Sequence, residues 1–189
     1  MVAGRALAED ELREAPIRID TSRTKCRILA ESHSSMLAGK QRFDLATLDF
    51  GDARVGDTTA AAYASKLVPS DRERFEAAKR TAGKSLAEKT RAAAHVYGIV
   101  AEATQPGSNA PFVIEPRVTR VEPGFYDDGT GESRLALRIA IKTTDGALVE
   151  ELEVEHWTTS GGRFSDDAGR LGPVLASYLD RGDCPQGTD

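Results

Sequence analysis

The fold is decided by residues 134–157, which read RLALRIAIKTTDGALVEELEVEHW. Apolar and basic residues alternate through the first half, which is the period-2 pattern of a β-strand with one buried face. The second half repeats this pattern with acidic residues in place of the basic ones. The positions on the predicted inner face are Leu135, Leu137, Ile139 and Ile141, then Leu148, Leu152, Val154 and His156. The stretch therefore predicts two strands, each with one face in the core.

The turn between the two halves fixes which residues face each other. Asp145-Gly146 is a favoured pair for the centre of a two-residue type I′ turn. The pairs that this turn produces are Leu137 with Val154, Arg138 with Glu153, and Ile139 with Leu152. A slip of one residue would spoil the apolar face and the charged face at once. The agreement predicts an antiparallel hairpin, with Glu151, Glu153 and Glu155 as a charge-matched stripe on its solvent side.

The longest amphipathic pattern runs from about residue 70 to about residue 104. Ser70 with Glu73 has the form of a capping box, in which each side chain satisfies an unpaired backbone N–H at the helix start. We expect Gly83 or Gly98 to bend or end the helix, because glycine costs about 1 kcal/mol relative to alanine in a helix interior. The apolar residues at helical spacing are Phe75, Ala78, Ala82, Leu86, Ala93, Val96, Val100 and Ala103.

The remaining patterns complete an α+β fold. Strands are expected over 43–50 and 112–122, and Pro116 places the backbone of the second at an edge or a bulge. A final helix is expected over about 166–180, with Gly182 as its stop. Grouped strands flanked by helices predict a small antiparallel or mixed sheet. We expect the long helix and the C-terminal helix to pack together on one face of this sheet.

Three segments are expected along the chain. Residues 1–40 have weak periodicity and predict a poorly ordered or irregular N-terminal segment, in which Ile17, Ile19, Ile28 and Leu29 are candidates for short strands. Residues 41–183 are predicted to form a single α+β domain. Residues 184–189 are predicted to form a tail.

Charge and composition limit the partners. The formal net charge is −5 and acids are mixed with bases, so no nucleic-acid partner is expected, since phosphate binding needs clustered Lys and Arg. No run approaches the roughly 20 apolar residues of a membrane span, so no transmembrane segment is expected. Cys26 and Cys184 have two readings: free thiols, or a disulfide that joins the ends in an oxidising compartment.

The compartment has two readings as well. The start of the chain has no apolar run long enough for a signal peptide, which predicts a cytoplasmic protein if the sequence is complete. A signal peptide missing from this chain would instead make the protein periplasmic or outer-membrane associated.

Few residues offer catalytic or ligand chemistry. His33, His95 and His156 share no metal-ligand spacing, and Ala82–Ser85 lacks the glycine spacing of a P-loop. The G-x-S-x-G, H-E-x-x-H and C-x-x-C motifs are missing from the sequence. We therefore predict no catalytic, cofactor-binding or metal-binding residues and no cofactor. His95 is predicted to be a partly buried structural histidine, and His156, beside Trp157, to cap the core. A ligand-contacting role for His156 is the open alternative.

Four segments carry a resemblance to a known family. They are 118–124 (VTRVEPG), 135–141 (LALRIAI), 145–149 (DGALV) and 175–179 (LASYL). Their order resembles a family of uncharacterised bacterial envelope lipoproteins, whose fold is similar to the TolB N-terminal domain and to the curli secretion lipoprotein. With the long helix counted, the resemblance covers about residues 70–180. It implies a binding or assembly module and brings no catalytic residues. Cys26 follows the sequence SRTK, which is not the lipobox of such proteins.

The expected function is a non-catalytic protein-binding or assembly module of the bacterial cell envelope. We expect a protein partner at the sheet edge or a helix face, and the sequence leaves the oligomeric state unknown. Two alternatives stay open. One is a cytoplasmic adaptor or regulatory domain, and the other is a small enzyme with a site near His156. A deep pocket lined by His156 and a carboxylate would favour the enzyme.

Overall fold

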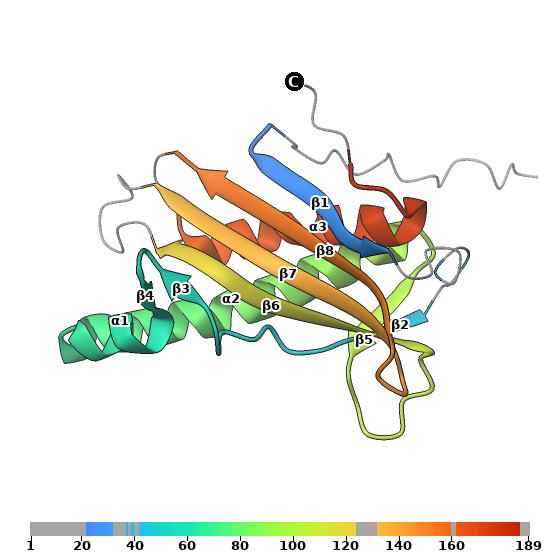
Figure 1. Cartoon of the computed structure of the whole chain (residues 1–189), viewed down its shortest axis with the longest axis horizontal. Helices are drawn as coiled ribbons and strands as arrows, with labels where there is room; N and C mark the ends of the chain where they lie inside the picture. Colours follow the sequence, from blue (N-terminus) through green and yellow to red (C-terminus); the bar gives the residue numbers. More distant parts are fainter. Residues whose placement is uncertain are drawn as a thin grey trace, which may run out of the picture.

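The computed structural model describes residues 22–31, 37, 39, 42–123, 132–159 and 162–185. The elements in chain order are β1 (Thr24–Glu31), β2 (Arg42–Leu45), β3 (Arg54–Val55), β4 (Thr58–Thr59), α1 (Ala60–Lys66), α2 (Pro69–Val96), β5 (Val100–Ala103), β6 (Phe112–Pro123), β7 (Ser133–Thr143), β8 (Leu148–Thr158) and α3 (Phe164–Arg181). Figure 1 shows the long strands crossing the molecule as one sheet, with α2 and α3 behind it. The predicted α+β class is confirmed.

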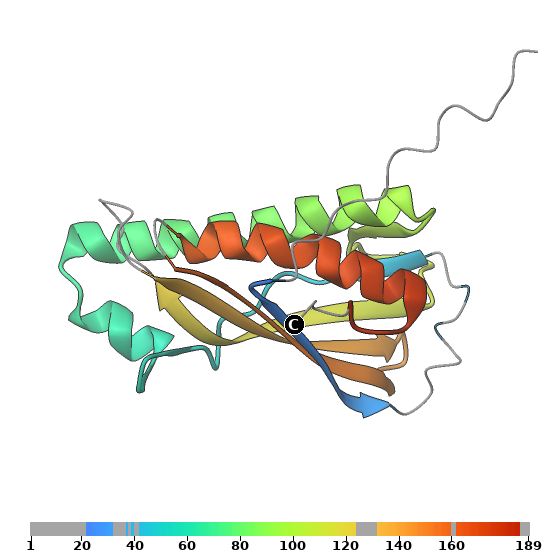
Figure 2. The same ribbon diagram turned by 90° about the horizontal axis from the view of Figure 1, so that it is seen from above.

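The sheet is mixed. The described strands form an eight-stranded sheet in the order β1-β8-β7-β6-β2-β5, with β3 pairing with both β6 and β4. The long strands β1, β8, β7 and β6 are antiparallel to one another, whereas β2 and β3 pair with β6 in parallel. Helices α2 and α3 lie side by side over one face (Figure 2). No described helix covers the opposite face of the sheet, which we call the outer face.

The hairpin has the predicted register but a different turn. Leu137 pairs with Val154, Arg138 with Glu153 and Ile139 with Leu152. At the turn, the Gly146 N–H donates to the Thr143 carbonyl over 2.9 Å, and the Thr143 N–H donates to the Ala147 carbonyl. A type I′ turn needs a positive φ at Asp145, and among the described residues only glycines have one. The predicted type I′ turn is therefore wrong, and Gly146 alone takes the left-handed conformation, at φ 90°.

A β-bulge reconciles the changed turn with the predicted register. Ile141 pairs with Glu150, but the next residue, Lys142, pairs with Leu148. Val149 is the extra residue, and it turns into the core at 1% exposure. Leu148, which was predicted to face inward, is 39% exposed. Alternation fails here because a bulge moves every residue beyond it to the other face.

The long helix begins and ends earlier than predicted. Helix α2 has Val68 as its N-cap, makes no side-chain cap hydrogen bond, and has Pro69 in its first turn. The capping box of Ser70 is therefore wrong: Pro69 suits the first helical position because it has no N–H to leave unsatisfied. The helix ends at Val96, and Gly98 follows with φ 71°. Residues Val100–Ala103, predicted to be helical, instead form β5 by parallel pairing with β2.

Two glycines bring the helices together. A Cβ on Gly172 would lie 2.6 Å from the backbone N of Thr90, and one on Gly169 would lie 2.5 Å from Ser85 Oγ. These contacts explain why α3 carries residues of low helix propensity. The helix spans Phe164–Arg181, slightly more than predicted, and Gly182 ends it at φ 72° as expected.

The sheet begins upstream of the predicted domain start. Strand β1 lies within segment 1–40 and pairs with β8, which corrects the prediction of an irregular segment for residues 24–31. Cys26 of β1 is bonded to Cys184 after α3, with the two Cα atoms 5.5 Å apart. Of the two readings of the cysteines, the disulfide is therefore the one found. Residues 1–21 and 186–189 lie outside the described residues, and the remaining domain limits stay predictions.

Candidate functional site

The histidine singled out from the sequence lies in a buried polar cluster. His156 is on the inner face of β8 and is 1% exposed, as its place in the alternation predicted. Its Nδ1 lies 2.9 Å from the hydroxyl oxygen of Thr24 on β1. Its Nε2 lies 3.8 Å from Oδ1 of Asp167 in α3. Three elements that are distant in the sequence therefore meet at this imidazole.

Asp167 is the centre of the cluster. Its side chain is fully buried and accepts hydrogen bonds from Ser133 Oγ at 2.6 Å and from Thr158 Oγ1 at 2.8 Å. Burial raises the pKa of the Asp167 carboxyl above its ordinary value, while these two hydrogen bonds and the charge of Arg170 act in the opposite direction. The carboxyl lies near the positive end of the α3 dipole, which favours its charged form.

Sequence reasoning missed Asp167 and Ser133. Their only signals were an acidic pair at a helix start and a serine at a strand start, and both are ordinary surface patterns. Neither signal shows that the two side chains meet across the interface between the sheet and α3.

The order of the groups in the cluster does not match a nucleophilic triad. In a triad the imidazole stands between the nucleophile and the carboxylate, so that it can take the hydroxyl proton. Here the carboxylate of Asp167 stands between Ser133 and His156, and the serine donates to the carboxylate. A Cβ on Gly162 would lie 2.2 Å from Ser133 Oγ, so Gly162 packs closely against one side of the hydroxyl. The cluster can therefore tie the sheet to α3, but it is not arranged for acyl transfer.

A small hollow borders this cluster at Ser133 and Thr158. It measures about 150 Å³ and is bordered by Lys25, Trp157 and the ends of β7 and β8. Lys25 Nζ lies 5.4 Å from the centre of the Trp157 ring. His156 and Asp167 do not line the hollow.

The outer face of the sheet carries a lattice of ion pairs. Arg27 on β1 contacts Glu153 at 2.7 Å, and Lys142 contacts Glu115 at 2.6 Å. Arg134 contacts Glu155, and Arg138 lies 4.0 Å from Glu151. Basic residues on one strand thus face acidic residues on the next. This confirms the predicted charge-matched stripe of Glu151, Glu153 and Glu155.

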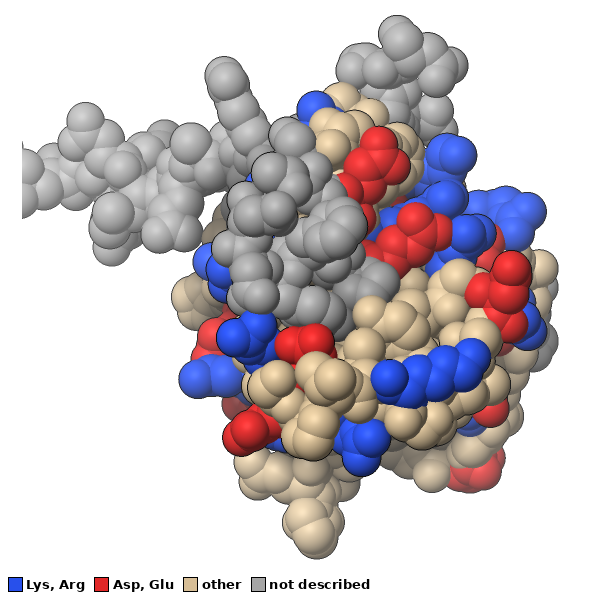
Figure 3. Space-filling view, turned by 90° about the vertical axis from the view of Figure 1, so that its left-hand side faces the viewer, with Lys and Arg blue, Asp and Glu red and all other residues tan. Residues whose placement is uncertain are grey.

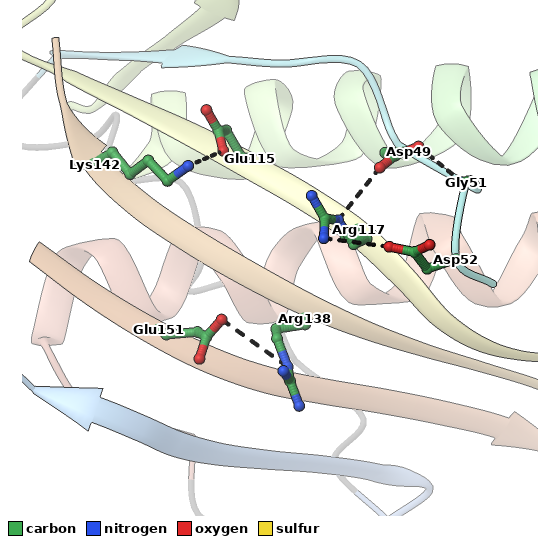
Figure 4. A network of polar contacts seen from close by, with 8 residues as sticks. All are labelled: Asp49, Gly51, Asp52, Glu115, Arg117, Arg138, Lys142 and Glu151. Atoms are coloured by element: carbon green, nitrogen blue, oxygen red, sulfur yellow. Dashed lines mark hydrogen bonds and ion pairs between the residues drawn. The ribbon is translucent and has the colours of Figure 1, made fainter. Parts of the chain in front are cut away.

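A hollow of about 460 Å³ opens within this lattice, with Pro116 and Ala140 among its lining residues. Arg117 and Arg138 border it and are direct cross-strand partners, an arrangement that would be unfavourable without compensating charges. Figure 4 shows the two guanidinium groups turned apart. Arg117 lies 3.3 Å from Asp49 and 3.5 Å from Asp52, while Arg138 turns toward Glu151. These exposed groups can exchange partners with an incoming polar surface.

The other predicted residues do not join either site. His95 is exposed in the last turn of α2, which corrects its prediction as a partly buried residue. Ala82–Ser85 lies inside α2 and not at a strand-to-helix turn, so it lacks the setting of a P-loop. His33 lies outside the described residues. Within the described ranges, no group of three or more His, Cys, Asp and Glu side chains is arranged to hold a metal ion.

Charges of both signs are mixed over the end of the molecule that carries α1, β3 and β4 (Figure 3). Among the described helices, none is both long enough and apolar enough to cross a membrane.

Comparison with known proteins gives only distant similarity. No family model matches the chain, and no curated protein is significantly similar to it in sequence. Among solved structures, the PelC dodecamer from Paraburkholderia phytofirmans is similar at 17% identity and a TM-score of 0.48, over 83% of this chain and 97% of that chain. A methionine variant of the same dodecamer has 19% identity and a TM-score of 0.45 over the same shares. Likeness at this level carries no statement about function.

Proposed function

We propose that this chain is a non-catalytic protein-binding or assembly module of the bacterial cell envelope. The observation that carries the envelope location in this proposal is the disulfide between Cys26 and Cys184. Disulfides form and persist in the periplasm and at cell surfaces and are rare in the cytosol. The bond therefore favours a periplasmic or outer-membrane-associated protein over a cytoplasmic adaptor.

The buried cluster supports a non-catalytic role. General acid or base catalysis needs a group within hydrogen-bond reach of a bound substrate. His156 and Asp167 are at most 1% exposed, and the hydroxyls of Ser133 and Thr158 donate to the carboxylate of Asp167. The polar groups of the cluster serve to fix α3 against the hairpin.

The uncovered sheet face supports a binding role. Its ion pairs are mostly exposed, so each contributes little to folding. Such pairs can rearrange when a charged partner docks, and charge complementarity then sets orientation and specificity. The hollow beside Ala140 gives this face a concave region within the lattice.

The compartment is tested by trapping thiols in intact cells. Cells are quenched in acid, and free thiols are then labelled with a maleimide–polyethylene glycol that shifts the protein on a gel. We expect no shift before reduction and two additions after it, one for each cysteine. The double variant Cys26→Ser, Cys184→Ser is the matched control and accepts no label. Full labelling without reduction would support the cytoplasmic adaptor instead.

Binding is tested by site-directed cross-linking in the same cells. A photo-reactive amino acid replaces Ala140 in the outer-face hollow, and a second variant carries it at exposed Arg91 of α2. We expect protein adducts from position 140 and none from position 91. An outer face that forms no adduct under conditions where the protein is expressed and oxidised would contradict the binding role.

A further inference from the structure

A second concave region lies between helix α2 and the chain that leads from β2 to β3. This groove has a volume of about 410 Å³. Its lining residues are Thr47, Leu48, Asp49 and Phe50 on the strand side and Glu76, Lys79, Arg80, Gly83 and Lys84 on the helix side. A groove between a sheet edge and a helix is the setting in which extended peptides add to a sheet as an extra strand.

The strand side of the groove is an irregular segment that lies along β6 through one isolated bridge, Asp49 to Arg117, and leaves an open edge. Ala46 and Asp49 donate their N–H groups to β6, at Ile114 and Pro116. Within the described chain, the N–H groups of Thr47, Leu48 and Phe50 donate to no backbone carbonyl. Strand β5 pairs only with β2, as far as Leu45, so no described strand lies against this edge. The edge therefore offers backbone donors to an added strand.

Pro116 explains why the edge has this shape. The register between this chain and β6 changes by one residue between the Leu45–Ile114 pair and the Asp49–Arg117 pair. Pro116 lies opposite the change and has no N–H to donate, so a regular ladder cannot continue there. Regular pairing of this chain with β6 breaks opposite Pro116, but the bulge of β6 itself lies between Val118 and Arg120, which corrects the prediction of an edge or bulge at Pro116.

Gly83 keeps the helix side of the groove open. Glycine destabilises the interior of a helix relative to alanine. The packing of Gly172 requires glycine, but a Cβ on Gly83 would meet only Leu48 Cβ, at an ordinary contact distance of 3.6 Å. Close packing thus gives no reason for glycine at position 83. A longer side chain there would occupy the groove.

The groove has surplus positive charge. Glu76 is engaged by Lys79 at 3.0 Å, and Asp49 is engaged by Arg117. Among the described residues, Arg80 makes no ion pair within 4 Å, and Lys84 has only a 3.9 Å contact with exposed Glu88. Lys79 Nζ also lies 5.5 Å from the centre of the Phe50 ring, which borders the apolar part of the groove. The surface therefore combines an apolar floor with a cationic rim.

We propose that an extended acidic segment of a protein partner docks in this groove as an added strand along residues 47–50. Alternate side chains of a strand point to opposite sides, so every second residue of the added strand would face α2, where acidic side chains can reach Arg80 and Lys84. The opposite sheet edge is less suited, because a bulge after Ile28 interrupts the regular backbone of β1. This inference rests on the proposed binding function and adds a docking site beside the outer-face hollow, with which the groove shares Thr47 and Asp49.

The test uses the full oxidised chain and a fluorescein-labelled peptide of alternating valine and glutamate, acetylated and amidated at its ends. Binding is followed by fluorescence anisotropy. Two control peptides are used: one replaces glutamate by lysine, and the other carries N-methylated backbone amides that block strand pairing. We expect saturable binding of the glutamate peptide and a loss of at least about tenfold in affinity for either control.

Variants of α2 locate the binding. Arg80→Glu with Lys84→Glu reverses the rim charge, and Gly83→Leu fills the groove. Each is expected to weaken the peptide by at least about tenfold, whereas Arg91→Glu, a charge reversal elsewhere on α2, changes affinity less than about twofold. Thermal melts verify that every variant is folded. Because Gly83→Leu alters packing and the charge reversal does not, loss of fold in one leaves the other as the test.

Three results would overturn the inference. They are no saturable peptide binding, equal binding by wild type and the charge-reversed variant, or self-association of wild type that Gly83→Leu abolishes in sedimentation. The last would assign the groove to a second copy of this chain. Adducts from position 140 that persist in Gly83→Leu, with no peptide binding, would refute the groove and leave the proposed function standing. An absence of adducts from position 140, both in the wild-type background and in Gly83→Leu, would refute the proposed function itself.

Discussion

Removing the disulfide is the sharpest test of how the ends of this fold are held. Cys26 and Cys184 are 158 positions apart, so the bond closes almost the entire described chain into one loop. The chain-entropy relation gives about 5 kcal/mol of stabilisation for a loop of this length. We expect the double variant Cys26→Ala, Cys184→Ala to lose about 3–5 kcal/mol of unfolding free energy, because measured effects usually fall below the relation.

The folded state should survive this change. Strand β1 stays paired with β8 from Thr24 to Glu31, and Trp157 N donates to the carbonyl of Arg23. The lower unfolding free energy therefore arises mainly from the unfolded state, which becomes more expanded without the cross-link. Domains of this kind have a total stability of about 5–15 kcal/mol, so the variant should fold but with little margin.

The assay is guanidinium unfolding followed by the fluorescence of Trp157, the only tryptophan in the chain. Two changes are expected together: a lower midpoint and a larger dependence of the unfolding free energy on denaturant, because more surface is exposed on unfolding. Wild type in reductant should match the double variant. A loss below about 1 kcal/mol with an unchanged denaturant dependence would refute the entropic reasoning.

Five further substitutions test the core, the helix caps, the buried carboxyl and the contact between the helices. Leu152→Ala should cost about 2–5 kcal/mol in denaturant melts, since the side chain is fully buried, and a loss under about 1 kcal/mol would place it outside the core. Thr59→Ala should cost about 1 kcal/mol because the Thr59 hydroxyl accepts from Ala62 N at the start of α1, whereas Ser70→Ala should leave the midpoint unchanged. Burial raises the pKa of the Asp167 carboxyl above its ordinary 3.8, so its contribution to stability is complete below that pH and is lost as pH rises through the folded-state pKa. The stability of wild type relative to Asp167→Asn should therefore fall from pH 4 upward. A rise in this difference would mean that the ion pair with His156 dominates. Gly172→Ala should cost about 1–3 kcal/mol in thermal melts, because the added Cβ would lie 2.6 Å from a backbone nitrogen of α2, and a neutral result would show that the helices can move apart.

The sequence by itself determined the central hairpin. Both faces of 134–157 carry information, one apolar and one charged, and a single register satisfies them together. It also determined that α2 and α3 are amphipathic and that Gly182 stands where α3 ends, whereas it left Gly83 and Gly98 as alternatives for α2. These features depend on residues close together in the chain, where spacing and local conformation are readable.

Contacts between residues that are distant in the sequence decided the secondary structure of residues 100–103 and the details of the hairpin turn. Val100–Ala103 continues a helical pattern, but pairing with β2 makes it a strand, because an open parallel edge satisfies its backbone groups. The turn at Gly146 and the bulge at Val149 each shift the pairing, and only together do they leave the predicted register unchanged.

The buried cluster around Asp167 and the groove beside α2 also depend on tertiary structure. Thr24 reaches His156 from 132 positions away, and Asp167 meets Ser133 from 34 positions away, so neither contact leaves a local pattern. The groove beside α2 arises from a proline on β6, a glycine on α2 and an edge segment between β2 and β3. The sequence determined which faces are buried because burial follows short-range periodicity, and packing decided which polar groups meet because that depends on how the buried faces are brought together.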